Sequence, residues 1–348
     1  MKKTSKIMSL VLAGAMVLSM TACAGNTAET TSAAAKTQET AADTASKAEE
    51  TTGAEASESE TAAKAEGTTY KIGVLQLVQH TALDAANDGF IAALDDAGIA
   101  YEVDQQNASG DQSACQTVAS KFANEKKDLI LAIATPAAQA MVGAVEDTPV
   151  LITAVTDPAE SGLVNTNEKP GANVTGTSDL TPVKEQIDLL KQLVPEAKTV
   201  GVLYCSAESN SKIQADMAKE AIAAAGMESK EYTVSSSNEI QTVVQSMVGA
   251  VDAVYAPTDN VIAAGMATVG MVAGDNNLPV ICGEAGMVQN GGLATYGIDY
   301  YQLGYMTGQQ AVKILTEGAS PADMPIEYLP AEKCELTVNE ETAQTLGI

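Results

Sequence analysis

The sequence predicts an α/β protein whose folded part has two similar lobes, each built on a doubly wound parallel sheet. Apolar runs alternate with helix-like runs along the chain, which is typical of parallel strands joined by helical crossovers. Nearly every position in the strand-like runs is apolar, as expected for strands covered by helices on both faces. The second half repeats landmarks of the first in the same order. We therefore expect two lobes with a ligand cleft between them.

Residues 1–22 have the order of a secretory signal: lysines, then the apolar run "IMSLVLAGAMVLSM", then small residues before Cys23. The segment is too short and wrongly flanked for a membrane span. Its ending, "MTAC", resembles the lipobox of bacterial lipoproteins, in which Cys23 carries the lipid. The alternative is an ordinary secretory signal with an incidental cysteine, but an A-x-A cleavage site is not obvious.

Residues 24–67 contain no large apolar side chain. Such a segment cannot bury enough surface to offset its ordering entropy, so the sequence predicts disorder. A random coil of 44 residues spans roughly 35 to 40 Å on average. We expect residues 23–67 to tether a folded body to a membrane through the lipid on Cys23.

The expected elements follow one another regularly in the first half of the folded part. Strand-like runs occupy 71–78, 100–107, 128–135 and 149–156, and helix-like runs occupy 82–98 and 116–126. Five landmarks return in the second half: Gly73 as Gly201, Gly98 as Gly226, Asp128 as Asp252, Pro149 as Pro279, and Gly162 as Gly292. Five matches in the same order, at offsets from 124 to 130 residues, indicate an internal duplication.

The charge balance excludes some partners. The chain has 45 acidic and 19 basic residues, and none of the basic residues is Arg. Residues 68–348 alone hold 36 acidic side chains and 13 lysines. Because this surface repels phosphates, we expect no nucleic-acid partner.

Enzyme and metal motifs are missing. The sequence has no G-x-S-x-G elbow, no P-loop, no G-x-G-x-x-G after a strand and a single His. "SNSK" at 209–212 matches S-x-x-K without its companion motifs. The cysteines after Cys23 form neither a disulfide framework nor a zinc site, although one pair could form a bridge; they are Cys115, Cys205, Cys282 and Cys334. We expect free thiols, no cofactor, no metal and no catalysis.

The candidate site lies at the carboxyl ends of the strands, where ligands bind open parallel sheets. "LAIATPAA" at 131–138 and "VYAPTDNV" at 254–261 share one pattern, an apolar strand followed by polar residues. We expect them to face each other across the cleft. The candidate ligand-binding residues are Gln79, His80, Thr135, Thr156, Asp157, Ser178, Ser206, Asn210, Thr258, Asp259, Asn260, Glu284 and Asp299.

Several of these residues also have a structural interpretation. Thr135 before Pro136 is typical of a helix N-cap, and Asp157 before a proline is a turn signal. His80 is the single His of the chain, which favours a position at the edge of the cleft or at a helix cap. Asp259 or Asn260 could cap the next helix, yet three adjacent polar residues exceed what one cap requires.

The residue types indicate a ligand with an ammonium group. Carboxylates without Arg do not clamp an anion in a bidentate manner, but they do suit a cation. The carboxylate of the same ligand fits the Thr135 hydroxyl and the backbone N–H groups that open its helix. A zwitterionic amino acid carries both the ammonium group and the carboxylate. A sugar fits less well, because the chain has no Trp and its two Phe are placed on helices.

An ordered set of motifs resembles a known family. They include "IGVLQLVQHTALDAANDGF", "GDQSACQTVASKF", "VLITAVTDPAESGLV", "NVTGTSDL" and "ATYGIDYYQLG". From about residue 70 to the C-terminus the chain resembles the substrate-binding lipoproteins of ABC importers that include aromatic amino acid uptake proteins. Five tyrosines near strand ends could line a flat pocket for such a ligand: Tyr204, Tyr255, Tyr296, Tyr300 and Tyr301.

The resemblance implies a type 1 periplasmic-binding fold with lobes at 68–178 plus 298–326 and at 179–297 plus 327–348. It implies hinge closure on the ligand, docking on an ABC permease, and a monomer outside the cytoplasm held by the lipid on Cys23. It favours Thr135, Asp157, Thr258, Asp259, Asn260, Glu284 and Asp299 as site residues. A sensor or adhesive lipoprotein of the same fold is the rival interpretation.

Overall fold

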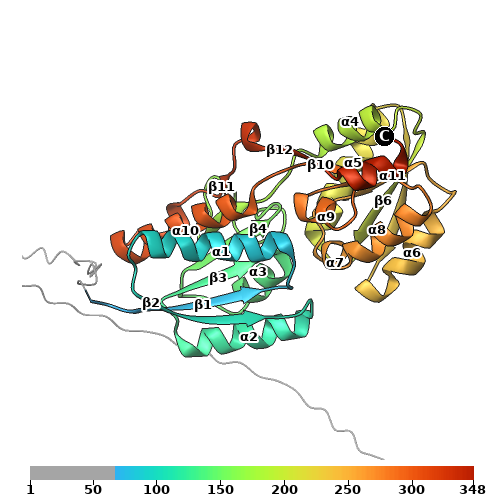
Figure 1. Ribbon diagram of the computed structural model, residues 1–348. Helices are drawn as coiled ribbons and strands as arrows, with labels where there is room; N and C mark the ends of the chain where they lie inside the picture. The colour runs from blue at the N-terminus through green and yellow to red at the C-terminus, as the bar shows by residue number, and fades with distance from the viewer. Residues whose placement is uncertain (1–66) are drawn as a thin grey trace, which may run out of the picture. The chain divides into compact units, whose positions relative to one another are not determined.

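The computed structural model describes residues 67–348 (Figure 1). The predicted signal at 1–22, the predicted lipid site at Cys23 and the predicted tether at 23–67 lie outside the described residues, apart from Gly67. The strands of one sheet are β1 (Tyr70–Gln76), β2 (Tyr101–Asn107), β3 (Leu129–Ile133), β4 (Val150–Val155), β5 (Val174–Ser178) and β11 (Glu327–Tyr328). Its helices are α1 (Thr81–Asp96), α2 (Gln112–Glu125), α3 (Thr135–Val142) and α10 (Tyr300–Glu317).

A second sheet follows the same plan. Its strands are β6 (Thr199–Cys205), β7 (Glu228–Val234), β8 (Ala253–Ala256), β9 (Val280–Cys282), β10 (Ala294–Gly297) and β12 (Glu335–Val338). The helices of this lobe are α4 (Val183–Leu193), α5 (Ser209–Ala224), α6 (Ile240–Met247), α7 (Asn260–Ala264), α8 (Met266–Asp275), α9 (Ala285–Gln289) and α11 (Glu340–Leu346).

The two sheets have equivalent strand orders. The first is β11-β5-β4-β3-β1-β2 and the second is β12-β10-β9-β8-β6-β7. The paired strands are parallel except for β12, which runs antiparallel to β10. The prediction of two lobes with mostly parallel sheets is therefore confirmed, and the matching orders show the internal duplication.

The repeated landmarks have the same physical roles in both halves. Gly98 and Gly226 follow the helix after the first strand of each sheet, α1 and α5, with positive φ values of 67° and 76°, a backbone region that favours glycine. Asp128 and Asp252 each accept a hydrogen bond of 2.8 Å from a backbone N–H at the start of the first strand of their lobe. The repeated residues therefore form equivalent turns after a helix and equivalent side-chain hydrogen bonds to the first strand of each sheet.

The chain passes between the sheets after β5, after β10 and between β11 and β12. Pairing with β5 places Glu327–Tyr328 in the first sheet, and pairing with β10 places Glu335–Val338 in the second. The lobe boundaries at 178 and 297 remain our proposal, whereas the boundary expected at 327 is too early, because Glu327 and Tyr328 pair with β5 of the first sheet.

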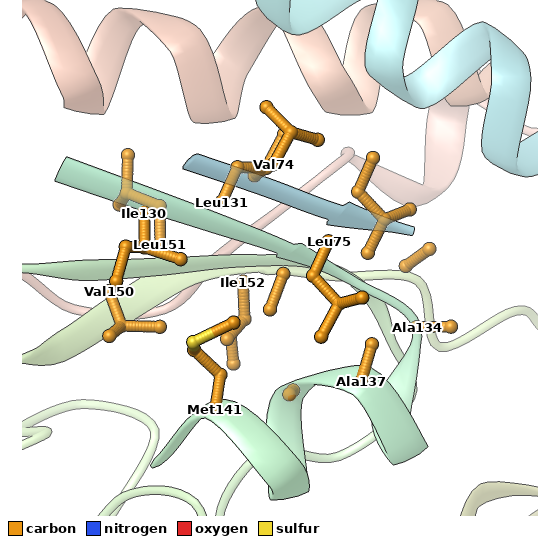
Figure 2. Packing of buried hydrophobic residues seen from close by; sticks show 14 of the residues in the cluster. Val74, Leu75, Ile130, Leu131, Ala134, Ala137, Met141, Val150, Leu151 and Ile152 are labelled. Atoms are coloured by element: carbon orange, nitrogen blue, oxygen red, sulfur yellow. The ribbon is translucent and has the colours of Figure 1, made fainter. Parts of the chain in front are cut away.

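The core of the first lobe covers both faces of its sheet. Figure 2 shows Leu75 and Ile152 pointing toward Met141 and Ala137 of α3, whereas Val74 points to the opposite face. All five residues of β3 are buried, as expected for a central parallel strand. None of the helices among residues 67–348 is both long and apolar enough to span a membrane.

Helices α1 and α10 meet at their backbones beside the first sheet (Figure 1). A Cβ on Gly304 would overlap the carbonyl oxygen of Ala86, and one on Gly89 would overlap that of Tyr301. Glycine is therefore required on both sides of this contact. The contact also fixes the first turns of the two helices, which reach the cavity described below.

Gly304→Ala should lower the free energy of unfolding by about 1 to 3 kcal/mol, because the new methyl group forces the two helix backbones apart. Urea denaturation of the purified chain measures the change. The matched control is Gly274→Ala in α8, where a Cβ would meet no described atom within 4 Å and helix propensity favours alanine. Equal losses in the two variants would contradict a backbone contact.

Candidate ligand-binding site

Residues of both lobes line a cavity of about 10 Å³. This is room for about one water molecule, so the side chains of the two lobes lie close together around it. The first lobe and the loop after β5 contribute His80, Ala82, Leu83, Ala154, Thr156, Asp179 and Tyr300. The second lobe contributes Asn210, Thr258, Asp259, Asn260, Ala263 and Glu284.

The fold brings these side chains together because most of them follow the carboxyl end of a strand. Thr156 and Asp179 come directly after β4 and β5, and Glu284 comes two residues after β9. Ala154 in β4 has a φ of 55°, which is uncommon for a residue with a Cβ. The register with β5 shifts between Ile152 and Val155, so an irregular strand end forms part of the cavity wall.

Asp179 lines the cavity, and its carboxylate can accept more hydrogen bonds than the protein donates to it. Its Oδ2 accepts a hydrogen bond of 2.8 Å from the Tyr300 hydroxyl, and its Oδ1 accepts one of 3.2 Å from Thr156. A carboxylate has about four acceptor positions, so two hydroxyl donors leave room for a ligand. Burial raises the pKa of Asp179 to about 6, against the opposing effect of these donors.

Glu284 caps the N-terminus of α9. Its Oε2 accepts from the Gly286 N–H at 2.5 Å and its Oε1 from the Met287 N–H at 2.8 Å. Burial raises its pKa to about 7, and the negative charge of Asp179 adds to this effect. Glu284 and Asp179 therefore influence each other across the cavity.

The carboxylate of Asp259 accepts its hydrogen bonds from groups of its own lobe. Its Oδ2 accepts from the Cys205 N–H at 2.5 Å and its Oδ1 from the Ile262 N–H at 2.8 Å. The Ser211 hydroxyl and the Val261 N–H also donate to it. Burial nevertheless raises its pKa. The carboxylate caps α7 and ties it to the end of β6.

Glu208, outside the candidate set, is a fourth buried carboxyl beside the cavity. Its Oε2 accepts from the Asn260 side chain at 2.7 Å and from the Asn210 side chain at 3.1 Å. Burial and the charge of Asp259 raise its pKa. Glu208 thereby orients two amides that line the cavity.

Hydrogen bonds join the two lobes around the cavity. Gln214 Nε2 donates to Thr156 Oγ1 at 3.1 Å and also to Thr258 Oγ1. His80 Nε2 lies 3.3 Å from Asn260 Oδ1. Burial lowers the pKa of His80, which leaves its ring neutral at pH 7.

Several buried polar atoms near the strand ends have no hydrogen-bond partner. Among the described residues they include His80 Nδ1, Thr135 Oγ1, Asn210 Oδ1 and Gln214 Oε1. A buried polar group without a partner costs about 1 to 3 kcal/mol. A polar ligand would satisfy such atoms.

The structure brings about half of the predicted site residues together around the cavity: His80, Thr156, Asn210, Thr258, Asp259, Asn260 and Glu284. The others lie nearby or elsewhere. Gln79 is exposed in a neighbouring groove, Thr135 is buried at the start of α3, and Ser206 is exposed.

Three further predicted residues have structural partners. Asp157 accepts the N–H groups of a turn at 3.1 and 3.0 Å. Ser178 donates to the Thr156 carbonyl at 2.6 Å. Asp299 is exposed and caps α10, accepting from the Tyr301 N–H at 2.9 Å. A ligand role for these residues stays a prediction.

Four important residues lie outside the thirteen candidates, although Tyr300 is one of the five tyrosines expected near a flat pocket, and each has a signal in the sequence. Asp179 and Tyr300 directly follow two candidates, Ser178 and Asp299. Glu208 follows the strand β6 by three residues. Gln214 comes four residues after Asn210, which places both on one face of α5.

No group of three or more His, Cys, Asp or Glu side chains within residues 67–348 is arranged to hold a metal ion. The four cysteines of this part are free thiols, and three of them are buried.

Two lobes with a polar cavity between them define a protein that captures a small ligand. Residues 71–348 match the family described as ABC transporter substrate binding protein, and the chain belongs to this family. The resemblance seen in the motifs and the fold class are confirmed.

The chain is similar to three characterised relatives. It is 41% identical over 354 residues to the tyrosine-binding protein of Clostridioides difficile strain R20291, covering 100% of this chain and 94% of the relative. The structure of an ABC domain from Streptococcus pneumonia in complex with L-Trp is 40% identical, with a TM-score of 0.78, covering 80% and 95% of the two chains. The ligand-free, open structure of a Clostridium difficile substrate binding protein with adhesive properties is 47% identical, with a TM-score of 0.62 and the same coverage.

Proposed function

We propose that this protein captures a free aromatic amino acid outside the cytoplasm, as a monomer, and delivers it to the permease of an ABC importer. The observation that carries the proposal is the set of buried carboxyls around a cavity that no lysine lines. Such a cavity favours a ligand with an ammonium group, since buried charges need a partner. The predicted lipid on Cys23 would hold the protein at the membrane.

The ammonium group would lie between Asp179 and Glu284. Asp179 supports this position because only two hydroxyl donors occupy its carboxylate. The ligand carboxylate would accept from the unpartnered Thr135 hydroxyl and from the N–H groups that open α3, where the helix dipole favours an anion. Asn210 and Gln214 would fix its orientation.

The aromatic side chain would lie against small apolar residues. Leu83, Ala154 and Ala263 line the cavity, and a neighbouring groove of about 200 Å³ continues along Ala264 and Ala267. Relatives that bind tyrosine and L-Trp support this choice of ligand.

Hinge closure would bury the ligand between the lobes. Hydrogen bonds between Gln214 and Thr156 and between His80 and Asn260 support a closed arrangement. The higher TM-score with the L-Trp complex than with the open, ligand-free relative, despite lower identity, supports it as well. The closed form would be the one that the permease recognises.

Calorimetric titration of the protein with tyrosine, tryptophan and phenylalanine tests the proposal. We expect micromolar or tighter binding of at least one of them, and recovery of the bound ligand chemically unchanged, because the site holds no catalytic motif. Inositol and a simple hexose serve as controls that lack the ammonium group. No binding of any amino acid at millimolar concentration would defeat the assignment.

Adhesion is a second candidate function, favoured by the adhesive properties of one relative. Uptake of a labelled amino acid by cells with and without the gene separates the two. Transport requires the uptake to fall in the deleted strain, whereas an adhesin without transport leaves uptake unchanged.

A further inference from the structure

Two carboxyl groups held on different sheets face one cavity. Asp179 is held on the first sheet, where its N–H donates to the Val155 carbonyl at 3.2 Å and its carboxylate accepts from Tyr300 at the start of α10. Glu284 is held on the second lobe as the cap of α9. Both are at most 5% exposed, and each influences the ionisation of the surrounding groups.

None of the groups around this pair supplies a positive charge. His80, before α1, is held neutral by burial, which lowers its pKa. Burial raises the pKa of Tyr300, so its phenol stays neutral as well. The Cys282 thiol, at the end of β9, is also neutral, because burial and the charge of Glu284 raise its pKa. Three further groups near the cavity are carboxyls: Asp259 before α7, Glu208 before α5 and Asp84 on α1. No lysine is among the residues that line the cavity.

Closure of an empty cavity therefore has an electrostatic cost. In an open cleft both carboxylates are solvated, and closure removes that solvent while bringing like charges together. One way to avoid the cost is to take up a proton. The raised pKa values of Asp179, about 6, and Glu284, about 7, agree with this, because burial is the main cause of both.

We propose that Asp179 and Glu284 make closure of the two lobes conditional on positive charge in the cavity, supplied by the ligand's ammonium group or by protons. The ammonium part rests on the proposed function; the proton part does not. Asp179 is thereby a specificity-determining residue, since a deaminated analogue brings no charge and leaves the like-charged pair unscreened.

The direction of the pH effect follows from the raised pKa values. Groups whose pKa is higher in the closed state bind more protons there, so acidification favours closure. The window runs from pH 8, where both groups are ionised in either state, down to pH 5, where both are protonated when closed. Protons and the ammonium group compete for the same carboxylates, so ligand affinity falls as the pH decreases.

Small-angle X-ray scattering of the ligand-free chain tests the proposal. We expect the radius of gyration to decrease between pH 8 and pH 5 in the wild type. Glu284→Gln and Asp179→Asn should already be compact at pH 8 and change little on acidification. Two variants are used so that a folding defect in one does not decide the outcome.

The matched control is Asp111→Asn. Asp111 caps α2 as Glu284 caps α9, accepting from Ser113 and Ala114, but it is exposed and does not line the cavity. This variant should behave as the wild type does, which separates the effect from the general loss of negative charge. Variants that remain as extended as the wild type at pH 8, or a wild type that stays extended at pH 5, would overturn the proposal. Because no ligand is present, either outcome is independent of whether an amino acid binds.

Discussion

Asp179→Asn should weaken binding of the aromatic amino acid by about 100-fold or more. Loss of one partner from a buried charge pair costs roughly 2 to 5 kcal/mol, and each 1.4 kcal/mol corresponds to about tenfold in affinity. Asn keeps the size of the side chain and still accepts a hydrogen bond from Tyr300. Calorimetry at pH 8 with the wild type and the variant measures the change.

A deaminated analogue of the same ligand separates charge recognition from general damage. The analogue should bind the wild type weakly, and Asp179→Asn should not weaken its binding further because no ammonium contact is lost. Asp111→Asn serves again as the control with wild-type affinity for both ligands. Equal losses for the amino acid and the analogue in Asp179→Asn would show that Asp179 acts on the shape of the site alone.

Asp259→Ala should lower the free energy of unfolding by about 2 to 4 kcal/mol. The substitution leaves the buried N–H groups of Cys205 and Ile262 without their acceptor, and each buried polar group without a partner costs about 1 to 3 kcal/mol. Relief of the repulsion with Glu208 offsets part of this loss. Urea denaturation at pH 7 gives the difference.

The control for this prediction is Asp299→Ala, which removes an exposed cap from α10. A typical cap contributes about 1 kcal/mol, so the Asp299 variant should lose less than the Asp259 variant. If the two losses are the same, Asp259 is an ordinary cap, and the tie between α7 and the end of β6 adds nothing to stability.

The sequence predicts most of the fold because the strand pattern and the repeat are local signals. The strand expected at 149–156 is observed at Val150–Val155, and the helix expected at 82–98 at Thr81–Asp96. The helix expected at 116–126 begins earlier, at Gln112. The cause is Asp111, whose side chain caps the helix through Ser113 and Ala114, so that a polar first turn without apolar periodicity is still helical.

The candidate site is predictable only in part, because adjacency at a strand end does not reveal which side chain reaches the cavity. Asp157 and Thr156 are neighbours in the chain, yet Thr156 lines the cavity while the Asp157 side chain accepts from the Ala159 N–H of the adjoining turn. The contact between Asp179 and Tyr300 joins residues 121 positions apart, and no local pattern encodes it. The assignment of Asp259 as a hydrogen-bonded cap likewise depends on the position of Cys205 on another strand.

The backbone contact between α1 and α10 also has a consequence for the order in which the chain can fold during export. Leu303, Ala311 and Ile314 of α10 belong to the core of the first lobe, although the whole sheet of the second lobe except β12 precedes them in the chain. The first lobe therefore cannot complete its core until the chain has emerged beyond Glu317. Until then the apolar face of α1 lacks its cover, and the two lobes cannot mature one after the other from the N-terminus.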